Sequence, residues 1–261
     1  MDNNVEYFPT KSYRRAVLLI RSVLLREKER LEALAHENAR SEGISPENLF
    51  SEIPRIVRFS RSYEEAFDRY LEAVLPQHRS GVRCGAGCGN CCHHFPMSVE
   101  PFELVRFYFE IRRSPELLSV LEKCHFRSRT YRDLFSAARA EGADDPDDVA
   151  LIRYFGHGFS CPFILPSKSC GVYAFRPVTC RMYFSETPGK YCVPEYLQTD
   201  LNRSFIVYLP DEVEELIADI SAHYASLSLP ESLYEGVVAM NAFESDFARA
   251  EEPFKSEGKA E

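Results

Sequence analysis

The spacing of apolar residues predicts a chain that is mostly helical. Over residues 11–41, apolar residues recur at intervals of three, four and seven: Val17, Ile20, Leu24, Leu31 and Leu34. Charged residues fill the positions between them, which is the pattern of an amphipathic helix. Gly43 and Pro46 follow this stretch, and both residue types end helices. We therefore expect one long helix over residues 11–41.

Further helices are expected along the rest of the chain. Ser62 and Glu65 have the spacing of a capping box, so a second helix is expected to begin at Ser62. The same reasoning places helices over 101–111, from Ser114, from Asp145, and from Asp211 to about Leu227. The apolar run 205–209 predicts a short strand, and the polar end, residues 254–261, predicts a frayed tail.

Two stretches, residues 79–95 and 158–196, show no periodicity and carry eight of the nine cysteines. The first is rich in glycine and holds the run Cys84-x3-Cys88-x2-Cys91-Cys92. The second is rich in proline and holds single cysteines at wide intervals: Cys161, Cys170, Cys180 and Cys192. Four cysteines within nine residues of a glycine-rich loop are not the pattern of core packing. We expect two irregular segments between helices.

The cysteine spacing indicates a site for a metal. Thiolates bind soft metals, and closely spaced thiolates repel one another unless a cation or a cluster lies between them. Glycines beside them can adopt positive φ angles and allow backbone N–H groups to approach sulfur. The ligand candidates are the eight cysteines of the two segments: Cys84, Cys88, Cys91, Cys92, Cys161, Cys170, Cys180 and Cys192.

Adjacent Cys91 and Cys92 point to a joint site. Neighbouring side chains diverge, so Cys92 is a poor fourth ligand beside Cys91; it serves a second site, lies in the second shell, or is a redox thiol. Cys84, Cys88 and Cys91 are expected to supply three thiolates, with at least one more from the second segment. The segment 158–196 should then fold over the loop 79–95.

The same residues resemble a known family. The order is the four-cysteine run, then Cys161-Pro162-Phe163, then the stretch from Cys170 to Arg181 with the pattern C-x2-Y-x2-R-P-x2-C-R, then Cys192. This combination is similar to the CxxCxxCC zinc- or iron-chelating domain family, the YkgJ-like cysteine cluster proteins. It spans 109 of the 261 residues. Two departures stand out: the first interval is x3 where the family name has x2, and the insert between Cys92 and Cys161 carries Cys124.

That resemblance implies metal or iron–sulfur binding. Some relatives are iron–sulfur proteins, and flagellin lysine methylases carry a similar cysteine cluster. Nothing in this sequence selects such an activity, so whether the protein is an enzyme stays open. The C-x3-C-x2-C spacing also occurs in radical SAM enzymes, but a helical pattern precedes the run and no alternation of strands and helices follows it.

Other polar residues near the cysteines have alternative interpretations. His93 and His94 could ligate zinc but are not required when eight thiols are present. Cys124 is expected to be a free thiol beside a surface His125. Arg176 and Arg181 flank Cys180, and either guanidinium could face thiolates or an anionic substrate, or could tie the Arg-Pro loop down through an ion pair.

Composition narrows the function further. The chain has 45% apolar residues, 27% charged residues and a formal net charge of −9. This balance excludes collagen-like and disordered classes and argues against a general nucleic-acid binder. The N-terminus lacks a basic region before an apolar run, and no apolar stretch near it approaches the length of a membrane span. We expect a cytoplasmic protein without membrane or nucleic-acid partners, in which reduced cysteines bind metal.

These observations give a mainly α fold, a helical domain with two irregular cysteine-rich segments converging on a metal site. The expected regions are an N-terminal helical region (1–78), a cysteine-cluster domain (79–196) with a helical insert (97–157), and a C-terminal helical region (197–261) that packs on it. Paired C-x2–4-C clips typical of zinc are missing from the second segment, which favours an iron–sulfur cluster over zinc. The alternatives are an enzyme that uses the cluster, lysine-methylase-like or of another redox or group-transfer activity, and a zinc-stabilised interaction module whose partner, a protein, is unknown.

Overall fold

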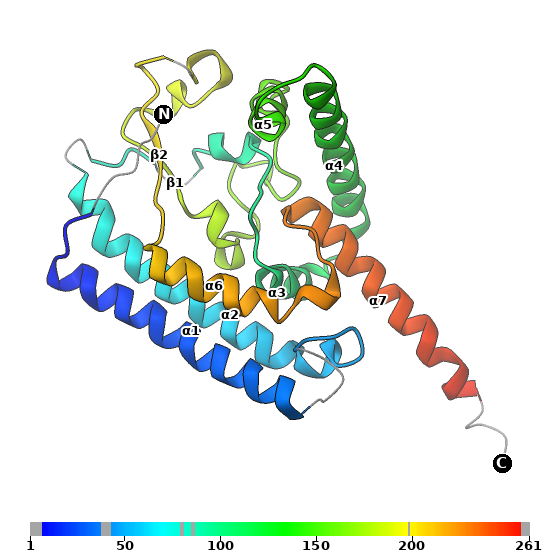
Figure 1. Ribbon diagram of the computed structural model, residues 1–261. Coiled ribbons are helices and arrows are strands. Elements are labelled where there is room, and N and C mark those ends of the chain that lie inside the picture. The colour runs from blue at the N-terminus through cyan, green and yellow to red at the C-terminus, as the bar shows by residue number, and fades with distance from the viewer. Residues whose placement is uncertain (1–6, 38–42, 79–80, 85–86, 198, 257–261) are drawn as a thin grey trace.

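Helices dominate the architecture, as the sequence predicts. The computed structural model describes residues 7–37, 43–78, 81–84, 87–197 and 199–256, and the side chains up to residue 246. Within these residues lie seven α-helices and a sheet of two short strands. The expectation of a mainly α fold is confirmed (Figure 1).

One layer of the molecule is built from three helices. α1 (Lys11–Glu37) packs along α2 (Leu49–Val74) and against α6 (Asp211–Ala222). The inner face of α1 carries fully buried Ile20, Leu24 and Leu31, so this amphipathic helix packs on its own domain. Leu18 and Leu25 lie on its outer face and stay exposed. The predicted end at residue 41 falls outside the described residues, in which α1 ends at Glu37.

The second helix begins earlier than the sequence predicts. The expected start at Ser62 is wrong, because α2 begins at Leu49 and runs through Pro54. Ile53, Ile56 and Phe59 extend the buried face of the helix towards its N-terminus. The free energy of packing this face outweighs the local capping signal at Ser62. Ser62 lies mid-helix instead, where its hydroxyl donates to the carbonyl of Arg58.

A second layer holds the remaining helices. α3 (Pro101–Ile111) packs on α2 and on α7 (Leu233–Ser256), while α4 (Leu117–Ala140) packs on α5 (Pro146–Gly156) and on α7. The predicted starts near residues 101, 114 and 145 agree with these bounds. α6 ends at Ala222, short of the predicted Leu227, and a 3-10 turn (Ala225–Leu227) follows. The predicted frayed tail is helical through Ser256, and residues 257–261 lie outside the described part.

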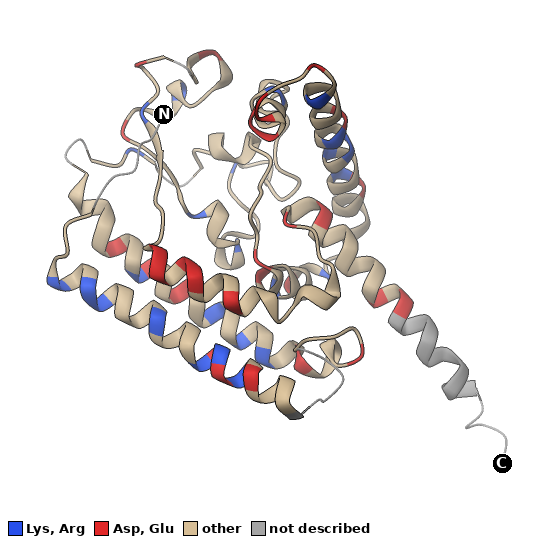
Figure 2. Cartoon of the chain, in the orientation of Figure 1, with Lys and Arg blue, Asp and Glu red and all other residues tan. Residues whose placement is uncertain are grey.

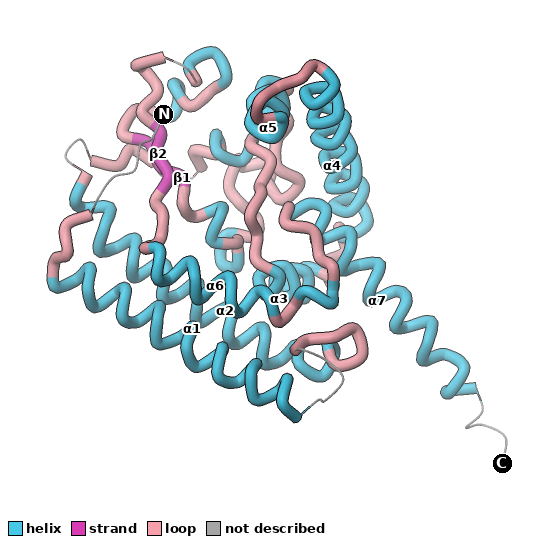
Figure 3. The backbone as a smooth tube through the Cα atoms, viewed as in Figure 1, coloured by secondary structure: helices cyan, strands magenta, loops and turns pink. Residues whose placement is uncertain are grey.

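The two strands form a small antiparallel hairpin. β1 (Tyr183–Ser185) pairs with β2 (Ser204–Ile206), with Phe184 opposite Phe205. The predicted strand 205–209 therefore exists but is shifted and shorter. Long loops gather between the α1–α2–α6 layer and the α4–α5 pair, and this is where both cysteine segments lie (Figures 1 and 3). Among the described residues, none of the helices combines the length and hydropathy of a membrane span.

Gly236 lets α7 approach α3 closely. A Cβ placed on Gly236 would come within 2.4 Å of Leu104 Cδ2, and Leu104 is fully buried in α3. Gly236→Ala should therefore destabilise the fold by roughly 1–3 kcal/mol, the usual cost of overpacking, and lower the urea midpoint. Gly156→Ala is the matched control, since its Cβ would meet open space at the end of α5. Equal midpoints for the two variants would contradict this packing.

Candidate metal centre

The first cysteine segment is a series of turns set by glycine. Gly87 and Gly89 adopt positive φ angles of 79° and 64°, which L-residues rarely take. Gly89 precedes a 3-10 turn (Asn90–His93) that carries Cys91 and Cys92. Cys84, Cys88 and Cys91 are exposed, and Cys92 is half-buried. The predicted positive φ angles are confirmed at Gly87 and Gly89, the predicted approach of glycine N–H groups to sulfur stays a prediction, and Gly85 lies outside the described residues.

The second segment is also irregular. Ile164 and Cys170 form an isolated antiparallel bridge, and two 3-10 turns follow, Tyr173–Phe175 and Val178–Cys180. All four cysteines of this segment are half-buried: Cys161, Cys170, Cys180 and Cys192. Phe163 packs edge-on against Phe107 of α3.

The structure brings the two segments together. The backbone N–H of Cys161 donates to the carbonyl of Cys92 at 2.8 Å, and the Asn90 amide donates to the carbonyl of Gly189 at 2.6 Å. The backbone N–H of Ser185 donates to Cys84 Sγ at 3.2 Å. The predicted convergence of residues 79–95 with residues 158–196 is therefore observed, although joint metal binding stays a prediction.

The thiols fall into an inner and an outer set. The inner set comprises Cys91, Cys161, Cys170 and Cys180, which act on one another electrostatically. The outer set comprises Cys84, Cys88 and Cys192, because Cys88 and Cys192 act electrostatically on Cys84. Cys91 also acts on Cys84, so this inner thiol is a neighbour of the outer set as well.

Burial favours the protonated form of the inner thiols. Burial raises the pKa of Cys161 to about 11 and raises that of Cys180 well above its ordinary value. A hydrogen bond with the Cys92 thiol is the largest cause of the raised pKa of Cys91. A bound cation would reverse this preference, because metal binding to cysteine displaces the proton.

The chemical type of the candidate ligands, cysteine thiols, suits a thiophilic metal. Within the described residues, however, no three Cys, His, Asp or Glu side chains are arranged so that they could already hold a metal ion. The thiols of the two segments are thus neighbours without surrounding one point. Small shifts of the exposed loop thiols Cys84, Cys88 and Cys91 toward the half-buried ones would be part of binding.

The two arginines beside Cys180 have different roles. The Arg181 guanidinium forms ion pairs with Glu64 at 2.7 Å and Asp68 at 2.8 Å on α2, so it ties the loop down. Arg176 stacks over the Tyr173 ring at 4.2 Å and favours the thiolate forms of Cys91, Cys170 and Cys180. Of the two interpretations that the sequence leaves open, the ion-pair tie fits Arg181 and the donor near thiolates fits Arg176.

Both histidines of the first segment are engaged elsewhere. His94 stacks on Phe155 with ring centroids 4.0 Å apart, and burial lowers its pKa to about 4. His93 Nδ1 lies 3.0 Å from the carbonyl oxygen of Gly158. Cys124 is fully buried in α4 beside the exposed His125, and its role as a free thiol stays a prediction.

Glu103 is a residue of this region that the sequence analysis missed. Its carboxylate, on α3, accepts a hydrogen bond from the backbone N–H of Val178 at 2.8 Å, two residues before Cys180. Glu103 also forms a capping box with Glu100 at the start of α3. The E-x-x-E spacing around Pro101 was the available signal, but it indicates only a helix start and not the contact with a distant loop.

Burial of Glu103 raises its pKa from 4.5 to about 8, so this carboxyl should make stability depend on pH. The folded state holds the proton more tightly than the unfolded state, so this group's contribution is full below about pH 4.5 and is lost as the pH rises towards 8. Glu103→Gln should flatten the fall in urea midpoint between pH 5 and pH 8. The surface variant Glu72→Gln should keep the wild-type fall, and an unchanged slope in Glu103→Gln would contradict this assignment.

The convergent segments offer thiols with a cationic side chain beside them, and thiolates are the soft ligands that zinc and iron–sulfur clusters prefer. Residues 83–198 match the model of the CxxCxxCC family, described as "Putative zinc- or iron-chelating domain". This stretch of the chain is therefore similar to that family, which confirms the resemblance of its motifs, and it includes all eight candidate cysteines. The chain matches no curated protein and no solved structure.

Proposed function

We propose that this protein holds a metal centre through thiolates from both cysteine segments, and that the centre is an iron–sulfur cluster. The observation that carries the proposal is the backbone hydrogen bond from Cys161 to Cys92, which fastens the second segment onto the first. This contact makes neighbours of four inner thiols that are up to 89 residues apart, from Cys91 to Cys180. Four thiolates are the donor set of common iron–sulfur clusters and of structural zinc.

Two features favour a cluster over zinc. One tight cysteine run is completed by single cysteines at wide intervals, whereas zinc sites are built from paired clips. The cationic Arg176 also lies beside three of the inner thiols, and hydrogen bonding and nearby charge are the means by which proteins tune such clusters. The outer thiols Cys84, Cys88 and Cys192 would close the site at the rim or form a second one.

This proposal assigns a role to each region of the chain. Residues 79–196 form the metal-binding domain, with the helices of the insert 97–157 within it, and the regions 1–78 and 197–261 support it. The family match over residues 83–198 supports these limits. A reducing, cytoplasmic location fits a site whose ligands must stay thiols.

Metal and sulfide analysis of protein purified without oxygen tests the proposal. Iron together with acid-labile sulfide, and a coloured protein, is the expected result. Zinc without sulfide would replace the cluster by a zinc site and leave the shared thiolate site intact. Protein that contains neither metal, and takes up neither under reducing conditions, would contradict the proposed function.

A further inference from the structure

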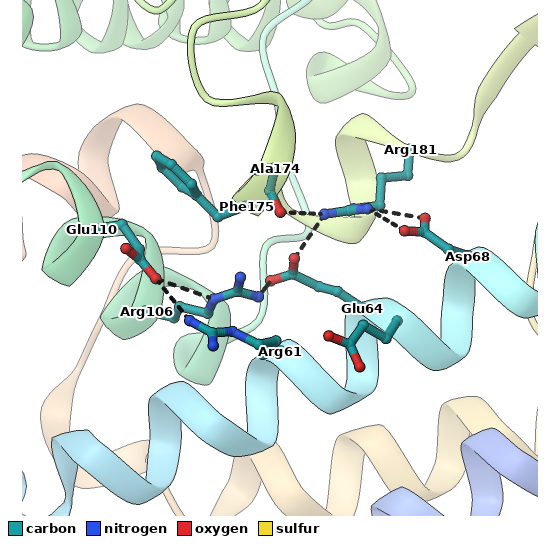
Figure 4. Close-up of a pocket in the computed structure, with 9 residues that line it drawn as sticks. Arg61, Glu64, Asp68, Arg106, Glu110, Ala174, Phe175 and Arg181 are labelled. Atoms are coloured by element: carbon teal, nitrogen blue, oxygen red, sulfur yellow. Dashed lines mark hydrogen bonds and ion pairs between the residues drawn. The ribbon is translucent and has the colours of Figure 1, made fainter.

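The turn that carries Cys180 is held by polar side chains on two helices. This turn, residues 173–181, is defined here as the Cys180 turn. From α3, Glu103 accepts a hydrogen bond from the backbone N–H of Val178 at 2.8 Å. From α2, Glu64 and Asp68 form ion pairs with Arg181 (Figure 4). The turn is thus attached to the helices on both sides of Cys180, at Val178 before it and at Arg181 after it.

Arg181 uses almost its whole guanidinium for this attachment. Its Nη1 donates to both carboxylate oxygens of Asp68, at 2.9 and 2.8 Å, and its Nη2 donates to Glu64 at 2.7 Å. Its Nε donates to the carbonyl of Arg176 at 2.8 Å. The side chain is only 5% exposed. One guanidinium therefore links α2 to the residue after Cys180 and to the backbone of Arg176, the arginine that faces the thiols.

Close packing does not replace this link on the α2 side of the turn. A cavity of about 360 Å³ lies between α2, α3 and the turn, and Ala174, Phe175 and Arg181 form part of its lining. Figure 4 shows the ion pairs of Arg181 at the edge of this cavity. Because the turn borders open space here, its position depends on directed hydrogen bonds from Arg181 to carboxylates, which are shorter and stronger than hydrogen bonds between neutral groups.

We infer that Arg181 is a positioning residue for the metal centre, through Asp68 and Glu64, by holding the Cys180 thiol and the Arg176 guanidinium in place. This inference rests on the proposed function, because it concerns the same site. Groups that orient ligands without touching the metal typically contribute 10- to 100-fold to affinity. Arg181 makes no direct metal contact in this account, since its guanidinium is saturated by carboxylates and a carbonyl.

The molecule supplies a matched control. Arg106 on α3 is equally buried, with 5% of its side chain exposed, and pairs with the other oxygen of the same Glu64. Its ion pairs are with Glu64 and Glu110, both on helices, and within the described part of the chain it forms none with the Cys180 turn. Removing either arginine leaves the same buried carboxylate with one partner fewer, so the structural cost of the two changes should be similar.

The test is titration of the reduced, metal-free full-length protein with Co²⁺, following the thiolate-to-cobalt absorption. Arg181→Met should weaken Co²⁺ binding by about 10- to 100-fold and lower the thiolate absorption per bound cobalt, because Cys180 is misplaced. Asp68→Asn should act in the same direction with a smaller effect; its half-exposed side chain makes it the variant that keeps the fold if Arg181→Met does not. Arg106→Met should keep the wild-type affinity and spectrum despite a lowered urea midpoint.

The outcomes of this titration distinguish failure of the positioning role of Arg181 from failure of the proposed function. If wild-type protein binds Co²⁺ through thiolates but Arg181→Met and Asp68→Asn bind it equally well, the positioning role is wrong and the proposed function stands. Equal losses in the Arg106 and Arg181 variants would mean that only stability matters, which also overturns the positioning role. Wild-type protein that shows no thiolate absorption with Co²⁺ would overturn the proposed function and this inference with it.

Discussion

Cys180→Ser is expected to abolish most metal binding, with a loss of affinity of at least about 100-fold. The reason is position: Cys180 lies in the inner set, with Cys91, Cys161 and Cys170 as electrostatic neighbours, so it joins the second segment to the first. Loss of a ligand should exceed the 10- to 100-fold effects of residues that only orient ligands. Cys88→Ser, in the first segment, should lower the metal content about as much. The metal content per folded chain, measured on anaerobically purified variants, checks the expected loss in Cys180→Ser and in Cys88→Ser.

Cys124→Ser is the control for these substitutions. Cys124 is fully buried and also feels Cys161 electrostatically, yet it lies on α4 outside both cysteine segments. The variant makes the same sulfur-to-oxygen change and should keep the wild-type metal content. Retained metal in Cys180→Ser, together with loss in Cys88→Ser, would show that the first segment binds alone and that the second cysteine group has another role.

Removal of the metal should loosen both cysteine segments at once. The contacts that join them in the structure are a few single hydrogen bonds, such as Cys161 N–H to Cys92 and Asn90 to Gly189. Metal binding to four thiolates contributes far more free energy than these bonds, about 10–16 kcal/mol for structural zinc sites. Amide hydrogen exchange in residues 88–94 and 161–192 should therefore become at least about tenfold faster when the metal is removed.

The helical body provides the internal reference for that exchange measurement. α1 and α2 are held by their own apolar core, including fully buried Ile20, Leu24 and Ile56, and none of these residues contributes a ligand. Exchange in their central turns should change little. Faster exchange in only one cysteine segment, or uniform acceleration through α1 and α2, would argue against a metal that closes one segment on the other.

Apolar periodicity was enough to predict most helices, because burial of one face determines them. The helix from Lys11 and the helix from Pro101 follow their patterns closely. The error at α2 shows the limit of local signals: Ser62 and Glu65 have capping-box spacing, but Ile53 and Ile56 continue the buried face upstream. A strand register such as Phe184 opposite Phe205 depends on a contact across some twenty residues, which no local pattern encodes.

The sequence was enough to predict the candidate cysteines but not the side chains that hold their loops in place. Thiol chemistry and spacing single out eight cysteines as candidate ligands, and their binding of metal stays a prediction. The partners of Arg181 lie more than 100 residues earlier on α2, and Glu103 reaches Val178 from α3. Ordinary charged residues on helices carry no sequence signal for such contacts, so only the fold reveals them.

Differential alkylation followed by mass spectrometry tests the central claim most directly. The reduced full-length protein is treated with an alkylating reagent for a short time with and without its metal, and each cysteine is read separately. We predict that metal protects Cys88 and Cys91 of the first segment together with Cys180 of the second, at the same metal-to-protein ratio. Protection confined to residues 84–92, with Cys161, Cys170, Cys180 and Cys192 reacting equally in both states, would contradict a centre shared by the two segments.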